Sequence, residues 1–261
     1  MVGGAEKTDF DGILARKGIA MTLLSNMASN PKTKKELKER GFEGTILHLA
    51  SADKVSEFIG RKVTVCPAAK ANGCDKPCLD EQGRGRMQTV KDARIKKTVR
   101  FFEDRKGFGQ ELREELNKLI KRATKKGFKP VARLDGTSDL GLAMKMHEEF
   151  PDIQFYDYTK VFPRMKRWLR DRPKNHHITF SLGNGNREEA REILGLGGNV
   201  AVVFRTRDQK KLPKTWEGFT VINGDQHDYR FLDPESSKGY VVGLTAKGTA
   251  YHDTSGFVQE I

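Results

Sequence analysis

The second half of the chain alternates short apolar runs with segments of helical periodicity. Three segments lie between the earlier of these runs, 140–149, 161–170 and 187–194. In them apolar residues recur three and four positions apart, as they do on one face of a helix. Alternating strands and helices predict a parallel sheet with right-handed crossovers. We therefore expect an α/β fold, either a partial (β/α) barrel or an open, mostly parallel sheet. The expected strands are 129–134, 153–158, 177–182, 199–204, 219–223 and 240–244.

The first half of the chain has a different pattern. Two helices are predicted over 87–102 and 108–125, each with its apolar residues on one face, and Gly127 ends the second. Before residue 60 the chain is more polar, with a basic helix from Pro31 to Arg40 and a short helix over 52–58. We expect an N-terminal helical extension of residues 1–59, followed by an α/β domain of residues 60–261 that binds a metal cluster.

All three cysteines of the chain, Cys66, Cys74 and Cys78, lie in one turn-rich segment. The residues before it, 61–65, are rich in β-branched side chains and read as a strand. The residues around the cysteines are Pro, Lys, Asn, Gly and Asp, which offer little apolar core. Burial of the cysteines as small hydrophobic residues is therefore a poor explanation of the segment. An odd number of cysteines also argues against a disulfide framework. The segment therefore predicts a metal site.

Three thiolates suit an iron–sulfur cluster better than structural zinc. Zinc prefers four ligands in a closed site, whereas no second cysteine pair and no nearby histidine follow in this segment. A 3Fe-4S cluster, or a 4Fe-4S cluster whose last iron is left for another ligand, needs only three thiolates. Radical S-adenosylmethionine (SAM) enzymes use such an open iron but space their cysteines more closely. S-adenosylmethionine therefore remains an alternative additional cofactor.

Polar residues gather at the carboxyl ends of the predicted strands, where the chemistry of α/β folds collects. Arg133, Asp135, Tyr156 and Lys160 stand at two such ends, and we expect them to bind a cofactor. His227, in the acid- and base-rich run 223–234, is a candidate fourth cluster ligand or proton donor. The Gly-rich run 183–186 allows a phosphate-binding interpretation at a helix start, and helix capping is the alternative for its Asn186.

The charge of the chain points to acidic partners in general. The formal net charge is +13, yet the basic residues are scattered over predicted helices among acidic and apolar ones. Specific nucleic-acid binding is therefore not favoured, although it is kept as an alternative. No apolar run reaches the roughly 20 residues that span a bilayer, so we expect no membrane span.

Several distinctive strings occur in an order that resembles a family of tailed-bacteriophage proteins, the gene product 88 family. They are the cysteine segment running into Gly83–Arg84–Gly85, and then 133–139, 155–160, 199–204, 224–234 and 243–248. The resemblance implies a phage-encoded protein in the cytoplasm of the infected host, and it supplies no reaction. The cysteine segment and the alternating strands also look like a radical-SAM barrel, in which Cys66, Cys74 and Cys78 would be the cluster ligands.

Three functions remain open from the sequence. The first is a viral iron–sulfur protein, redox-active in electron transfer or in interference with host metabolism, with a host protein or redox partner. The second is a radical S-adenosylmethionine-type enzyme that uses the open iron. The third is a nucleic-acid-binding protein with structural zinc.

Overall fold

A single mixed sheet forms the centre of the protein. The computed structural model describes residues 22–29, 31–74, 78 and 83–261. In this part of the chain the sheet has ten strands in the order β1-β2-β3-β4-β5-β6-β9-β8-β7, and β10 pairs with β6. The strands are β1 (Leu24–Asn26), β2 (Phe42–Leu47), β3 (Lys129–Arg133), β4 (Gln154–Thr159), β5 (His176–Ser181), β6 (Val200–Phe204), β7 (Thr215–Trp216), β8 (Phe219–Asn223), β9 (Val241–Thr245) and β10 (Val258–Gln259).

The sheet is mostly parallel and open. β1 is antiparallel to β2 and β7 is antiparallel to β8, whereas the other pairings, from β2 through β6 to β9 and β8, are parallel. Five neighbouring strands, β2 to β6, follow one another in chain order. The α/β prediction with an open, mostly parallel sheet is therefore confirmed, and all six strands predicted after residue 128 are present.

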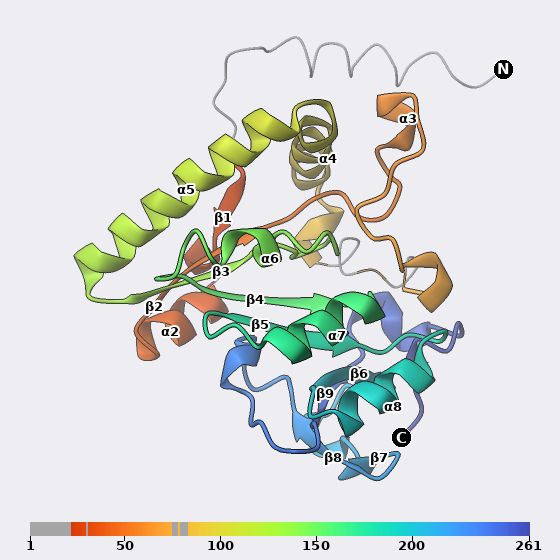
Figure 1. The fold of residues 1–261 in the computed structure, drawn as a ribbon. Coiled ribbons are helices and arrows are strands. Elements are labelled where there is room, and N and C mark those ends of the chain that lie inside the picture. Colours follow the sequence, from red (N-terminus) through yellow and green to blue (C-terminus); the bar gives the residue numbers. More distant parts are fainter. Residues whose placement is uncertain (1–21, 30, 75–77, 79–82) are drawn as a thin grey trace, which may run out of the picture.

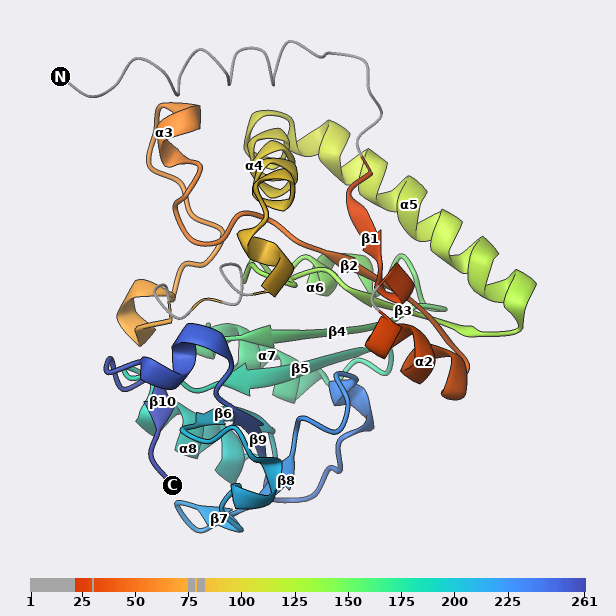
Figure 2. The ribbon, with the colours of Figure 1, turned by 180° about the vertical axis from the view of Figure 1, so that it is seen from behind.

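The helices that connect these strands cover one face of the sheet. α7 (Phe162–Asp171) and α8 (Arg187–Gly195) lie in front of the strands in Figure 1 and behind them in Figure 2. Their apolar residues form a core with β5 and β6. α4 (Gln88–Glu103) and α5 (Arg105–Lys126) match the two predicted helices, and α5 packs its apolar face on residues of β3 and β4. Gly127 ends α5 in the left-handed conformation, as predicted.

The opposite face of the sheet has its own small core. Side chains alternate along a strand, so Phe155 joins the helix-covered core while the next residue, Tyr156, points to the other face. There Tyr156 packs with Met27, Leu37 of α2 (Pro31–Glu39) and Tyr229. This second core fills the amino-end half of that face, which leaves the carboxyl-end half for a cavity.

Part of the predicted N-terminal extension belongs to the sheet. The basic helix is present as α2, and α3 (Ser56–Ile59) matches the short helix. Between them, β2 pairs with β3 over residues 42–46, and β1 pairs with β2. β1 and β2 therefore belong to the sheet of the α/β domain, while residues 1–21 and 30 of the predicted extension lie outside the described residues.

Two local predictions are wrong in a way that matters for the site. Residues 61–65 form no strand: the amide of Val63 donates to the Ser56 hydroxyl at 3.1 Å and that of Val65 to the carbonyl of Ala52 at 3.0 Å. Val63 and Val65 are buried there without pairing to a strand, whereas Thr64 is exposed. The helix predicted over 140–149 shrinks to α6 (Ala143–Met146), because Asp135 holds the preceding residues in a loop.

Among the described residues, no helix is long and apolar enough to cross a membrane.

Candidate metal centre

A cavity of about 280 Å³ opens at the carboxyl ends of the parallel strands. All three cysteines line it, and β3, β4, β5, β6 and β9 each contribute at least one lining residue. The polar groups of its wall include Arg133, Ser138, Asp139, Tyr158, Lys160, Ser181, Asp228 and Lys247. The three cysteines and residues from the ends of several parallel strands therefore share one space.

The three thiols are half-buried and form no disulfide. The Cys66 sulfur lies 3.7 Å from the carbonyl oxygen of Thr137, and the Cys74 sulfur lies 3.7 Å from that of Ala69. Burial raises the pKa of the Cys66 thiol to about 12, and the nearby Cys78 and Cys74 act in the same direction. In the absence of a metal, then, Cys66 keeps its proton, and a bound metal would have to displace it.

The cysteine segment is docked on the sheet by close backbone contacts. η2 (Lys70–Asn72) lies against the loop after β5, where the amide of Asn184 donates to the carbonyl of Asn72 at 3.2 Å. The Ser255 hydroxyl donates to the carbonyl of Gly73 at 3.2 Å, and the Asn184 side chain donates to the carbonyl of Ser255 at 2.7 Å. The loop after β5 and the segment at Ser255 thus fix the position of the cysteines over the strand ends.

This docking replaces the phosphate-binding interpretation of residues 183–186. The amide of Gly183 already donates to the Asn186 side chain at 2.7 Å, and that of Asn184 is bound to Asn72. A side chain at Gly183 would lie 2.5 Å from the Cβ of Asn72, and one at Gly185 would overlap the carbonyl oxygen of Ala71. The glycines permit the close approach of the cysteine segment, and the amides of Gly183 and Asn184 already have acceptors within the protein.

Lys160 places a cation on the cavity wall. Its Nζ donates to the Ser181 hydroxyl at 2.5 Å and lies 5.1 Å from the centre of the Phe257 ring. Burial lowers the pKa of Lys160, while the charges that the three cysteine sulfurs and Asp139 would carry oppose that decrease. An ammonium group in this position favours negative charge on the sulfur ligands.

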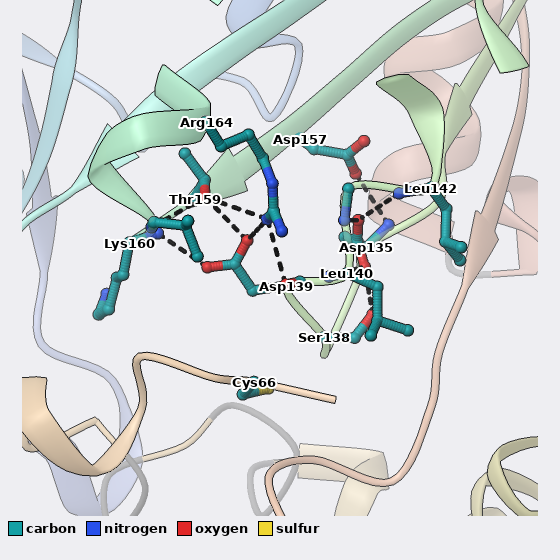
Figure 3. A network of polar contacts seen from close by, with 12 residues as sticks. Cys66, Asp135, Ser138, Asp139, Leu140, Leu142, Asp157, Thr159, Lys160 and Arg164 are labelled. Atoms are coloured by element: carbon teal, nitrogen blue, oxygen red, sulfur yellow. Dashed lines mark hydrogen bonds and ion pairs between the residues drawn. The ribbon is translucent and has the colours of Figure 1, made fainter. Parts of the chain in front are cut away.

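Asp139 holds the end of β4 in place. Its carboxylate accepts from the Thr159 hydroxyl at 2.8 Å and from the Lys160 amide at 2.9 Å, and it forms an ion pair with Arg164 (Figure 3). Burial raises the pKa of Asp139, and the Arg164 charge opposes this. The carboxylate of Asp139 thus serves to hold Lys160 in position.

Asp135, predicted to bind a cofactor, instead folds the loop behind the cavity. Its carboxylate accepts from the Ser138 hydroxyl at 2.5 Å and from the amides of Leu140, Gly141 and Leu142 at 2.8–3.1 Å (Figure 3). Its own amide donates to Asp157 at 2.8 Å. This loop carries Thr137, whose carbonyl oxygen contacts Cys66.

The other predicted site residues divide into two groups. Arg133 lines the cavity, with its guanidinium carbon 4.8 Å from the centre of the Tyr158 ring. Tyr156 is fully buried in the small core below, and His227 lies beside Arg230 and Asp233, so neither lines the cavity. Burial lowers the pKa of His227 to about 4, and the Arg230 charge adds to this.

Beyond the residues predicted to bind the cofactor or the cluster, the polar residues of the lining include Tyr158, Ser181, Asp228 and Lys247. Tyr158 shares the strand face of Tyr156 but stands two residues nearer the carboxyl end, which is the position that faces the cavity. Ser181 stands at the end of β5, at the same level as Lys160. Asp228 and Lys247 belong to loops, where no periodic pattern signals orientation.

The three cysteines line one cavity but do not form a ready-made site for a single metal ion. Within the ranges that the structure describes, no group of three or more His, Cys, Asp or Glu residues is arranged to hold a single ion. A cluster binds each thiolate through a different iron, so it accepts sulfurs that are farther apart. The chain has no fourth cysteine, and no described histidine lines the cavity, so a four-ligand zinc set of the usual kind is not assembled there.

Comparison with known proteins gives one match. The family model of gene product 88 matches residues 22–261, which include the whole sheet and the cysteine segment. No curated protein and no solved structure matches the chain.

Proposed function

This chain belongs to the gene product 88 family, and on that premise we propose that it is a phage-encoded iron–sulfur protein of the host cytoplasm. Its three cysteines would hold a 4Fe-4S or 3Fe-4S cluster at the mouth of the cavity. Such a cluster supplies one-electron redox chemistry when it is bound. The role would be electron transfer to a partner or interference with host metabolism.

One observation carries this proposal: Cys66, Cys74 and Cys78 all line the same cavity at the carboxyl ends of the strands. Three cysteines buried separately in apolar cores would have no such common space. The segment is also anchored from both sides, by Thr137 at Cys66 and by Asn184 and Ser255 at η2. A ligand segment held in this way needs little rearrangement when it binds a cluster.

The other residues of the wall would support the cluster without binding it. Lys160 would balance the negative charge of the thiolates, and Ser181 would keep its Nζ in place. The loop 136–142, organised by Asp135, would shield one side of Cys66 from water. These residues set the charge and the solvent exposure, the two properties by which a protein adjusts a cluster's potential.

Metal and sulfide analysis of protein purified without oxygen tests the proposal. We expect iron and acid-labile sulfide, a broad visible absorption, and an electron paramagnetic resonance signal that distinguishes 3Fe-4S from 4Fe-4S. C66S, C74S and C78S should each lose the cluster, while the control A71S, an exposed position of the same segment, should retain it. A colourless protein with stoichiometric zinc would contradict the proposal and favour the nucleic-acid-binding alternative.

A second candidate is an enzyme that binds S-adenosylmethionine next to the cluster. The observation in its favour is the order of elements: the cysteine segment follows the first parallel strand, β2, and opens onto a cavity with room for an organic ligand. The test is reductive cleavage of S-adenosylmethionine by the reduced protein. Absence of cleavage in fully reduced, cluster-loaded protein would eliminate this candidate.

A further inference from the structure

Arg133 carries a guanidinium group without an acceptor in the part of the chain that the structure describes. No hydrogen bond or ion pair joins its side chain to another described residue, and its Nε is buried without a partner. The guanidinium lies over the Tyr158 ring, with its carbon 4.8 Å from the ring centre, which is a cation–π contact. A buried donor left without an acceptor destabilises the protein, and a charged donor does so more strongly.

Asp139, Lys247 and Lys160, three other charged residues of the cavity wall, each have a partner within the protein. Asp139 is paired with Arg164, and the Lys247 Nζ lies 2.7 Å from the Asp225 carboxylate. Lys160 has the Ser181 hydroxyl as acceptor. Arg133 is thus the cation of this wall whose donors still need an acceptor.

We propose that Arg133 binds the oxyanion group, a carboxylate or a phosphate, of a small organic ligand in this cavity. The guanidinium fork matches both groups with two parallel hydrogen bonds, which an ammonium group does not do. Arg133 reaches the cavity from β3 and Tyr158 from β4, so this subsite is built whether or not a cluster is bound to the cysteines.

The remaining wall restricts the ligand. Asp228 presents a carboxylate that accepts no side-chain hydrogen bond from any described residue, so a second negative group on the ligand would be repelled. A cavity of about 280 Å³ lies just below the usual range for drug-sized ligands. The ligand is therefore a metabolite-sized molecule with a single oxyanion group and a neutral or cationic remainder.

Binding of simple probes to the full-length chain tests this site. Butyrate and methyl phosphate represent the two oxyanions, and butyramide is the neutral counterpart of butyrate. The readout is the Nε–H nuclear magnetic resonance signal of Arg133, assigned by its absence in R133K, during titration of metal-free and of cluster-reconstituted protein. We expect saturable shifts with at least one oxyanion and none with butyramide.

Matched variants distinguish binding at Arg133 from a general effect of removing one positive charge. Because these variants lack the Arg133 signal, isothermal titration calorimetry compares their affinity with that of the wild type: R133Q should weaken binding at least tenfold, and R133K should weaken it severalfold because the fork is lost. R207Q is the control, since Arg207 also stacks on a tyrosine, with its guanidinium carbon 4.6 Å from the Tyr251 ring centre, but is exposed and outside this lining. Its affinity should equal that of the wild type.

The outcomes decide between the possibilities. Binding of butyrate alone identifies a carboxylate ligand, and binding of methyl phosphate alone a phosphate ligand. If neither probe shifts the Arg133 signal, if butyramide shifts it equally, or if R133Q binds as well as R207Q, the proposed subsite is wrong. If protein purified without oxygen contains no iron and yet binds a probe at Arg133, the subsite stands while the cluster proposal fails.

Discussion

Gly185, in the loop after β5, lies directly against the carbonyl oxygen of Ala71 in the cysteine segment. A side chain at position 185 would overlap that oxygen, so the glycine allows two distant parts of the chain to meet. Together with the bond from Asn184 to Asn72, this contact seats the cysteines on the carboxyl edge of the sheet.

The first prediction is that Gly185→Ala displaces the cysteine segment. The extra methyl group should cost roughly 1–3 kcal/mol of unfolding free energy, as overpacking does, and should lower the iron content of the purified protein. Urea unfolding and iron analysis measure the two effects. Gly195→Ala is the control, because nothing lies within 4 Å of that added methyl group at the end of α8. Equal iron content in both variants would show that the docking does not position the ligands.

The second prediction concerns the cation at Lys160. If the cluster is bound as proposed, Lys160→Met removes a positive charge beside it and should lower its reduction potential, because the reduced form carries more negative charge. We expect a change on the order of tens of millivolts, where 59 mV is a tenfold change in a one-electron equilibrium. Potentiometric titration measures it. Lys160→Arg keeps the charge and should restore most of the potential; failure of that rescue would point to a packing effect.

The third prediction is structural and involves Asp135. Asp135→Asn keeps the shape of the side chain but places an amide group where three backbone amides and the Ser138 hydroxyl now donate to carboxylate oxygens. Because unsatisfied buried donors are costly, we expect a loss of roughly 2–3 kcal/mol in urea unfolding. Asp152→Asn, at an exposed position, should change stability by less than about 0.5 kcal/mol. A similar effect of the two substitutions would mean that the loop does not depend on Asp135.

The sequence was sufficient for the strands whose apolar residues form unbroken runs, such as 199–204, and for the helices with a regular apolar face, such as α5. It was misleading at 61–65, where Val63 and Val65 are buried but pair with no neighbouring strand. β7 and β10 are two residues each, too short for any period to show. Pattern analysis therefore succeeded where local periodicity and tertiary burial agree.

The candidate site was partly predictable for a similar reason. Cys66, Cys74 and Cys78 stand out by residue type, and Arg133 and Lys160 by their place at strand ends. Being near a strand end does not determine whether a side chain faces the cavity. Tyr156 lies two residues before the cavity-lining Tyr158 on the same face of β4, and it packs in the small core instead. Asp135 follows β3 at a turn that directs its carboxylate into its own loop. These distinctions depend on register, which only the folded sheet defines.

The last prediction concerns acid stability and His177, which lies on β5 away from the cysteines. Burial lowers the pKa of His177 to about 4, and the charges of Arg230 and Arg172 lower it further; Glu235, at 3.7 Å from its Nδ1, and the Trp168 ring also face it. The unfolded chain binds this proton near the ordinary pKa of about 6.5. Stability from this residue should therefore be present above that pH and be lost as the pH falls toward 4.

Comparison of the wild type with His177→Gln isolates this contribution from that of buried acids such as Asp233, whose raised pKa acts in the opposite direction. Between pH 7 and pH 4, the variant should lose less unfolding free energy than the wild type, by on the order of 2–3 kcal/mol at about 1.4 kcal/mol per pKa unit. Urea unfolding at both pH values measures the difference. His252→Gln, at an exposed position, should follow the wild type. Parallel pH profiles for wild type and His177→Gln would mean that His177 takes up its proton in the folded protein as readily as in the unfolded chain.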